Sequence, residues 1–202
     1  MQAIENDLDI MAILKAGTSE PHGAIEKIMP FFRNDFSLED YARVLKAFLG
    51  FFEPVERELA SISTWDLVGL NLNERLRSNL LRADLLAFGV STSEMALIPR
   101  CDDLPSLTNL DEGFGCLYVL EGSTLGGQLI TCRVQALFAV GEEVGITFFH
   151  GYGSHTGAMW RDFCAVLRKH VDRNKNQTTI LTAARSTFEK LESWMRKADF
   201  GE

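Results

Sequence analysis

Lys15, His22 and Glu26 are the residues near the start of the chain whose types and spacing could bind a ligand. Lys15 and His22 are seven residues apart, so on an unbroken helix they would project from one face about 10.5 Å apart along the axis. A neutral imidazole can ligate a metal, and a lysine ammonium can pair with a carboxylate. Glu26, four residues after His22, could hold the orientation of the ring. The spacing suits a flat, anionic ligand that is coordinated at its centre.

Each of these three residues also has an ordinary structural interpretation. A histidine on the apolar face of a helix is usually a core residue bonded to a backbone carbonyl, and a lysine there usually extends its ammonium to water. The Glu26 and His22 side chains could simply form a surface pair one turn apart. An apolar stripe predicts that Lys15 and His22 lie at inward positions, together with Leu8, Met11, Thr18, Ile25 and Met29.

A second candidate site is a stretch of predicted helix that contains Gly122, Gly126 and Gly127. Each interior glycine costs about 0.5–1 kcal/mol relative to alanine, so the cluster needs a compensating reason. Gly122 and Gly126 are four residues apart and face the same way, which leaves a groove where a flat ligand or another backbone could lie. Close packing against a neighbouring helix would explain the glycines equally well. The spacing matches no phosphate-binding loop.

The elements that position these residues are predicted to be helices nearly throughout. Apolar residues recur at three and four spacing over 37–53, 71–88, 108–140, 156–173 and 177–197, and alternation with period two is almost absent. Helix starts are predicted at Ser37, Asn71 and Ser91, and breaks at Pro30, near Pro54, at Gly89, over 99–105 and across 141–157. Pro21 predicts that a fresh helix begins around Ser19 or that the first segment kinks there.

Length and composition limit the class of protein. The chain has 202 residues and a formal charge of −8, the wrong sign for binding to nucleic acid through phosphates. We expect one domain over residues 1–202, with no internal repeat. The N-terminus has no basic segment and no apolar run is long enough to span a bilayer, so we expect a cytoplasmic protein without a membrane partner. The cysteines are widely spaced, which favours buried thiols for all of them: Cys101, Cys116, Cys132 and Cys164.

Two segments together resemble the haem oxygenase family, most closely its soluble bacterial members associated with bacteriophytochromes. Residues 14–22, Leu-Lys-Ala-Gly-Thr-Ser-Glu-Pro-His, are similar to the proximal segment of the family. Residues 117–128, Leu-Tyr-Val-Leu-Glu-Gly-Ser-Thr-Leu-Gly-Gly-Gln, are similar to its glycine-rich distal helix. Supporting patterns at 77–85 and 156–160 extend the resemblance over most of the chain. The resemblance implies a single-domain all-α bundle with haem between the proximal and distal helices.

The resemblance also implies a role for each candidate residue. His22 would ligate the haem iron, with Glu26 as its partner, and Lys15 would contact a propionate. Gly122, Gly126 and Gly127 would cover the other side of the haem, with Ser123 beside them. Arg161 is a candidate for the second propionate and Tyr118 for the pocket wall, although a solvent-exposed arginine and a packing tyrosine are equally consistent with the sequence. Arg77 and Asp84 would make structural polar contacts near the distal helix.

Haem would then be both cofactor and substrate, opened by O₂ and electrons to biliverdin, carbon monoxide and ferrous iron. A ferredoxin or a reductase would supply the electrons, and in phytochrome-associated members a bacteriophytochrome would accept the biliverdin. Many members have aspartate where this chain has Ser123, so Ser123 or Thr124 with ordered water would share proton delivery. The missing aspartate leaves a non-catalytic haem carrier as an alternative. A helical bundle that binds no haem is the third interpretation.

Overall fold

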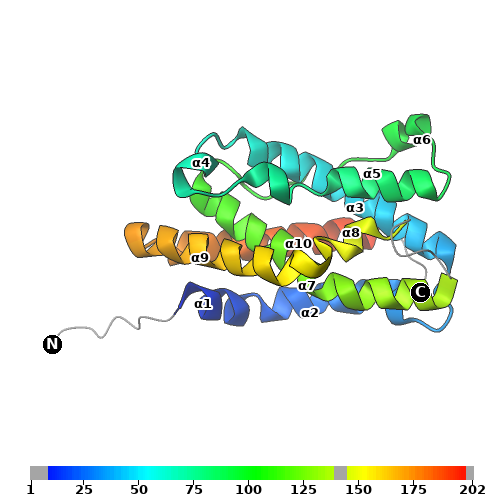
Figure 1. Ribbon diagram of the computed structural model, residues 1–202, viewed down its shortest axis with the longest axis horizontal. Coiled ribbons are helices and arrows are strands. Elements are labelled where there is room, and N and C mark those ends of the chain that lie inside the picture. The colour runs from blue at the N-terminus through cyan, green and yellow to red at the C-terminus, as the bar shows by residue number, and fades with distance from the viewer. Residues whose placement is uncertain (1–8, 139–144, 199–202) are drawn as a thin grey trace.

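Helices pack along a common direction in the computed structural model, which describes residues 9–138 and 145–198 (Figure 1). The described residues contain no strand, which confirms the predicted all-α class. None of the described helices is long and apolar enough to cross a membrane. In chain order the elements are α1 (Ile10–Gly17), α2 (Ser19–Ile28), η1 (Pro30–Phe32), α3 (Leu38–Ser61), α4 (Trp65–Val68), η2 (Leu72–Arg75), α5 (Ser78–Ala87), α6 (Thr92–Leu97), α7 (Leu110–Phe138), α8 (Thr147–His150), η3 (Gly153–His155), α9 (Thr156–Asn174) and α10 (Gln177–Lys197).

The first helical segment is divided at Thr18, as Pro21 predicted. The Thr18 hydroxyl donates to the carbonyl of Leu14 at 2.7 Å and closes the end of α1. A new helix starts at Ser19, so Pro21 lies in the first turn of α2, where a missing N–H breaks no helical hydrogen bond. Because the helix is interrupted, the separation of Lys15 and His22 cannot be taken from an unbroken helix.

The predicted break near Pro54 is wrong, because α3 continues through this residue to Ser61. A proline inside a helix leaves the carbonyl four residues earlier without its N–H partner. Here that carbonyl belongs to Gly50, and it accepts a hydrogen bond from the backbone N–H of Cys101 at 2.9 Å. A residue far away in the sequence therefore satisfies the group that Pro54 leaves open, and the helix is preserved.

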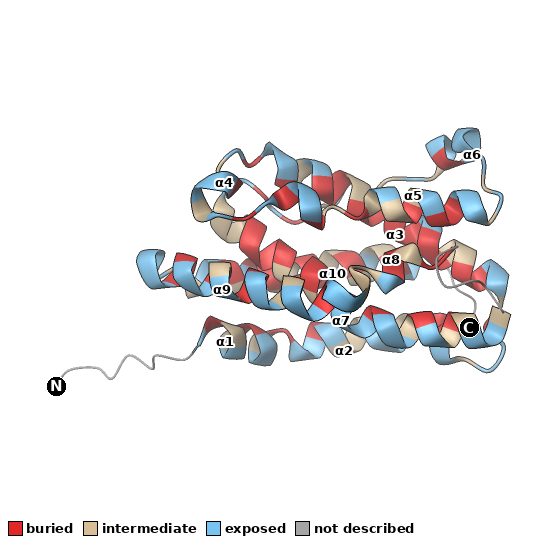
Figure 2. Ribbon diagram, viewed as in Figure 1, coloured by how far each residue is buried: buried red, intermediate tan, exposed pale blue. Residues whose placement is uncertain are grey.

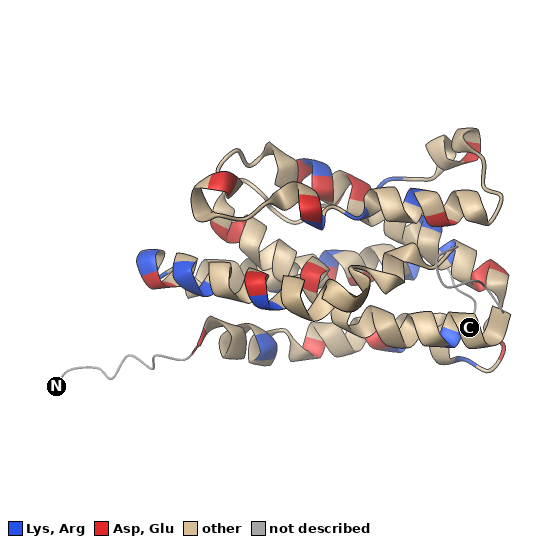
Figure 3. Ribbon diagram, viewed as in Figure 1, with Lys and Arg blue, Asp and Glu red and all other residues tan. Residues whose placement is uncertain are grey.

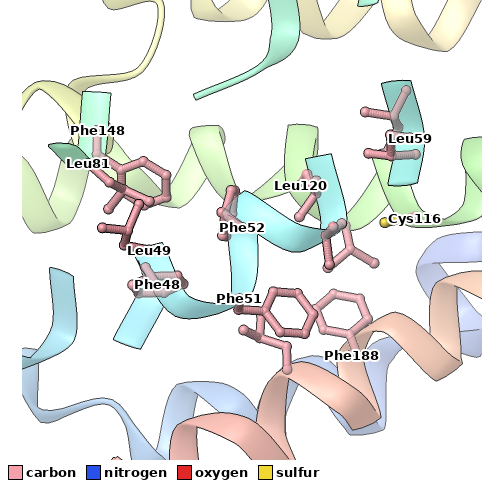
Figure 4. Packing of buried hydrophobic residues seen from close by; sticks show 14 of the residues in the cluster. Phe48, Leu49, Phe51, Phe52, Leu59, Leu81, Cys116, Leu120, Phe148 and Phe188 are labelled. Carbon is pink, nitrogen blue, oxygen red and sulfur yellow. The ribbon is translucent and has the colours of Figure 1, made fainter. Parts of the chain in front are cut away.

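The core is built mainly from α3, α7 and α10, and buried residues gather in the middle of the bundle (Figure 2). Phe48, Phe51 and Phe52 of α3 lie between Phe148 of α8 and Phe188 of α10 (Figure 4). Helices α7 and α10 approach closely at Gly115, where an added Cβ would lie 2.3 Å from the carbonyl oxygen of Ile180. Gly115 is therefore explained by helix packing.

Local sequence signals set most of the helix boundaries. Ser37 and Ser91 both form capping boxes, with Asp40 and Glu94 respectively, as predicted. Asn71 caps only a short 3₁₀ turn, so the predicted helix over 71–88 is divided into η2 and α5. The prediction that all four cysteines are core residues holds for three of them, since Cys132 is exposed.

Asp84 on α5 fixes the position of α8. Its carboxylate accepts hydrogen bonds from the backbone N–H groups of Thr147 and Phe148, both at 2.9 Å, and from the Thr147 hydroxyl at 2.6 Å. Burial raises the pKa of Asp84, and these three hydrogen bonds act in the opposite direction. This structural role agrees with the one predicted for Asp84, and it holds α8 against α5.

We expect Asp84→Ala to lower the free energy of unfolding by about 2–3 kcal/mol, because the substitution leaves the N–H groups of Thr147 and Phe148 without a partner. Denaturant unfolding monitored by circular dichroism measures the change. Asp172→Ala, at an exposed position on α9, is the control and should change the free energy by less than about 0.5 kcal/mol. Equal stability of the two variants would contradict the assignment.

Candidate functional site

Two contacts connect α7 to the N-terminal segment. At one end, Tyr118 is half-buried on α7, and its hydroxyl makes a hydrogen bond with Thr18; burial raises the pKa of Tyr118 and this bond opposes the shift. At the other end, the Arg133 Nε donates to the carbonyl of Phe31 at 3.4 Å. Helix α2 occupies the sequence between Thr18 and Phe31, so it lies beside the part of α7 between Tyr118 and Arg133 (Figure 1).

The face of α7 between these contacts is open. Gly122, Leu125, Gly126 and Leu129 follow one another at helical spacing, on the face that carries Tyr118 and Arg133. Leu125 is 47% exposed and Leu129 63% exposed, unusual values for large apolar side chains grouped on one face. From Gly122 to Phe138 the only charged residue is Arg133, and Figure 3 shows this part of α7 almost without charge. We call this face, together with the opposing side of α2, the cleft.

The surroundings of the glycines separate the two explanations that the sequence left open. A Cβ at Gly126 would meet no described atom within 4 Å, and one at Gly122 would touch only the Trp160 ring, at 3.9 Å. Neither glycine is therefore required for helix packing. A Cβ at Gly127, in contrast, would lie 2.2 Å from the carbonyl oxygen of Phe149. Close packing of α7 on α8 therefore explains Gly127, on a different side of the helix from Gly122 and Gly126.

His22 lies on the exposed side of α2 and not at an inward position, which corrects the prediction from the apolar stripe. Its side chain is 56% exposed, and its ring packs edge-on against Phe188 with the centroids 5.6 Å apart. The Nδ1 atom is 3.5 Å from a carboxylate oxygen of Glu26, the contact that their spacing predicted. With Nδ1 directed to Glu26, Nε2 is the nitrogen that remains for a ligand.

Lys15 and Arg161 are exposed and make no ion pair with any other described residue. Arg168 of α9 pairs with Asp9, next to the start of α1, at 2.8 Å, and the two helices run in opposite directions (Figure 1). Lys15 lies six residues after Asp9 and Arg161 seven residues before Arg168, distances of about 9 and 10.5 Å along the axes. Lys15 and Arg161 therefore lie at similar positions along the axes of the neighbouring helices α1 and α9.

A buried group of charged residues beside Gly122 was not found from the sequence. Arg75 donates to Glu121 at 2.7 Å and to Asp162 at 2.6 Å, and the Tyr152 hydroxyl donates to Glu121 at 2.6 Å. Arg75 is 4% exposed and Glu121 1% exposed. The one available signal was the acidic Glu121 inside an apolar helix, because such a residue needs a cationic partner when it is buried. This group fixes α7 at the residue that precedes Gly122.

Arg77 holds the next turn of α7. Its guanidinium donates to the carbonyl of Leu120 and, at 2.9 Å, to the hydroxyl of Ser123, which itself donates to Leu120 at 2.6 Å. This confirms the structural polar contact predicted for Arg77. Thr124 is buried, and its hydroxyl donates to the carbonyl of Glu121 at 2.7 Å. Its side chain lies against Gly151, outside the open face, so its predicted share in proton delivery is not supported.

These observations define an all-α protein with an exposed histidine on α2 and, on α7, an open face that contains Gly122 and Gly126. Lys15 and Arg161, on neighbouring helices, are exposed and form no ion pair with any other residue that the structure describes. A flat ligand with a metal centre and carboxylates matches this arrangement. The chain belongs to the haem oxygenase family, because the family model described as "Heme oxygenase" matches residues 8–197.

Two of the solved structures with a similar fold are bacterial heme oxygenases. The NO- and CO-bound heme oxygenase from Neisseria meningitidis has a TM-score of 0.77 at 22% identity, covering 95% of this chain and 92% of that chain. The heme oxygenase from Leptospira interrogans has a TM-score of 0.76 at 22% identity, covering 94% of this chain and 100% of that chain. No curated protein sequence is similar enough to count as a match. At this identity the structural likeness shows the fold, and the site residues must be argued from this chain.

Proposed function

We propose that the protein binds haem in the cleft between α2 and α7 and cleaves it to biliverdin, carbon monoxide and ferrous iron. The observation that carries the proposal is the open space at Gly122 and Gly126 on the face of α7 that lies beside the helix of His22. When bound, haem supplies both the iron that activates O₂ and the ring that is opened, so the protein provides binding, orientation and exclusion of water.

The residues of the cleft fit this ligand. His22 would ligate the iron through Nε2, and Glu26, whose carboxylate is 3.5 Å from Nδ1, would hold the orientation of the ring. Lys15 and Arg161 would pair with the two propionates, and Arg161 could do so with both arms of its guanidinium. Tyr118 closes the wall beside Trp160, since their ring centroids are 5.9 Å apart. Gly122 and Gly126 let the backbone of α7 approach the ring.

Ser123 and Arg77 organise the distal side in place of an aspartate. The Ser123 hydroxyl donates its proton to the carbonyl of Leu120, so the Ser123 oxygen can act only as an acceptor. One hydrogen bond that it accepts comes from Arg77. A guanidinium stays protonated at neutral pH and cannot itself release a proton. We infer that protons enter the cleft through water bound at the Ser123 oxygen, while Leu125 and Leu129 keep the rest of the distal side dry.

Hemin added to the purified protein, followed by ascorbate or a ferredoxin reducing system, tests the function. Haem oxygenase activity predicts loss of the Soret band and growth of a biliverdin band that catalase does not suppress. A Soret complex that survives the reductant would indicate a haem carrier, and no spectral shift on adding hemin would indicate a bundle that binds no haem. Either of these results would overturn the proposal.

We expect Lys15→Ala and Arg161→Ala to weaken haem binding by about 2–5-fold each, because solvent-exposed ion pairs contribute up to about 1 kcal/mol. Loss of one anchor should also broaden the set of biliverdin isomers, since the propionates fix the rotation of the ring. Hemin titration and chromatography of the product measure the two effects. Lys169→Ala, an exposed lysine further along α9, is the control. If both variants bind haem with unchanged affinity and give the same biliverdin isomers, Lys15 and Arg161 do not bind the propionates.

A further inference from the structure

The buried guanidinium of Arg75 joins two helices that border the cleft. It donates to the Glu121 carboxylate of α7 at 2.7 Å, to the Asp162 carboxylate of α9 at 2.6 Å and to the carbonyl of Met159, also on α9, at 3.3 Å. A guanidinium is planar and holds its donors in a fixed geometry, so these contacts set the separation of α7 and α9 at this point. The interactions proposed above for haem binding make no use of Arg75.

The part of α9 that Arg75 binds carries two residues that border the proposed haem site. Trp160 and Arg161 directly precede Asp162 in the sequence. A Cβ built on Gly122 would touch the Trp160 ring at 3.9 Å, so α9 lies against the open face of α7 at this residue. Arg161 carries the cation proposed for one propionate. A shift of α9 relative to α7 would therefore move Arg161 relative to the open face at Gly122.

Glu121, the contact of Arg75 on α7, is held from two sides. One carboxylate oxygen accepts from Arg75, and the other accepts from the Tyr152 hydroxyl at 2.6 Å. Burial raises the pKa of Tyr152 and the negative charge of Glu121 raises it further, so the phenol stays protonated and remains a donor. Gly122 follows Glu121 in the sequence, so this end of the open face is fixed. The position of α9 depends in addition on the bond from Arg75 to Asp162.

We propose that Arg75 and Asp162 are positioning residues that set how haem is rotated in the cleft, and therefore which edge of the ring is cleaved. This inference rests on the proposed haem oxygenase function. The backbone at Gly122 and Gly126 lies against the ring, while Arg161 holds a propionate at its border. The relative position of these two points is set by the separation of α7 and α9. Without the bond to Asp162 this separation is held less precisely, and so is the rotation of the ring.

Asp162 is the position at which the bridge can be tested in a folded protein. Arg75→Ala would leave the buried carboxylate of Glu121 without its cationic partner, a change that is strongly destabilising. The Asp162 side chain is 62% exposed, so we expect Asp162→Ala to lower the melting temperature by no more than about 4 °C. Asp172→Ala removes another exposed carboxylate from α9 and is the matched control.

The test follows the rotation of haem in two ways on the full chain. Proton NMR of the haem methyl groups, recorded on the hemin complex without reductant, reports the rotation in the bound state. Chromatography of the biliverdin isomers after turnover with ascorbate reports the edge that was cleaved. We expect Asp162→Ala to give a second set of methyl resonances and to raise the ratio of minor to main isomer about fivefold, which corresponds to about 1 kcal/mol. A loss of folded protein alone would change neither ratio.

Asp162→Asn distinguishes positioning from the loss of a negative charge near the propionates. Its amide oxygen can still accept from Arg75, so its isomer ratio should stay closer to that of the unsubstituted protein than the ratio of Asp162→Ala does. Equal shifts in these two variants, no shift in Asp162→Ala, or an equal shift in Asp172→Ala would overturn the positioning role while the haem oxygenase function stands. Failure of the unsubstituted protein to bind or cleave hemin would overturn the proposed function, and this inference with it.

Discussion

The His22→Ala protein is expected to lose the spectrum of a histidine-ligated haem and to lose haem cleavage by more than about 100-fold. Removal of an outer partner of a metal ligand typically costs 10–100-fold, and removal of the ligand itself should cost more. The His22 ring is more than half exposed and its apolar contact is with one edge of Phe188, so the fold should tolerate the substitution. Absorption spectra during a hemin titration, followed by a single-turnover assay with ascorbate, measure both effects.

Added imidazole provides a second readout of the same assignment. It fits the space left by the missing ring and can ligate the iron, so it should restore the spectrum of the His22→Ala complex. The matched control is His155→Ala, at an exposed histidine on η3. Normal spectra and normal turnover of His22→Ala without imidazole would remove the proximal ligand from the proposal, and the cleft would then need another ligand or another function.

Periodicity predicted α9 and α10 well because each of these two helices buries one apolar side. The stripe over 177–197 gave the bounds of α10 as the structure has them. In the stripe predicted over 156–173, Phe163, Leu167 and Val171 are buried and Trp160 is half-buried. Predicted helix breaks were less dependable, because a residue elsewhere in the chain can make the hydrogen bond that a proline leaves unmade. Pro54 illustrates this, since the hydrogen bond that preserves α3 comes from Cys101, and nothing near Pro54 in the sequence indicates it.

The candidate site could be predicted only in part, for a similar reason. The spacing of His22 and Glu26 predicted a contact within one helix, and the contact is present. Arg75 and Glu121 are 46 residues apart, so their buried pair depends on how α7 packs. The sequence also gave Gly122, Gly126 and Gly127 the same possible roles. Only the neighbours in space show that Gly126 borders the open cleft and that Gly127 faces the backbone of α8.

Adjacent glycines on α7 should therefore respond to substitution in opposite ways. We expect Gly126→Leu to raise the stability of the haem-free protein by about 0.5–1 kcal/mol, because the new side chain enters open space and leucine has the higher helix propensity. The same side chain would project into the cleft and displace the haem. Turnover should fall by about 100-fold or more, as expected when a reacting group is misplaced by an ångström. Thermal melting and the ascorbate assay measure the two effects.

Gly127→Ala is the matched counterpart of Gly126→Leu. Its methyl group would lie 2.2 Å from the carbonyl oxygen of Phe149, so α8 or α7 must shift and the free energy of unfolding should fall by about 1–3 kcal/mol. Any loss of turnover in this variant should follow its loss of folded protein. If Gly126→Leu instead unfolded the protein, or left haem binding and turnover unchanged, the face of α7 at Gly126 would not be the wall of the haem site. If Gly126→Leu loses activity while it keeps its stability, Gly126 belongs to the haem site. If Gly127→Ala loses stability and activity together, Gly127 belongs to the packing of the fold.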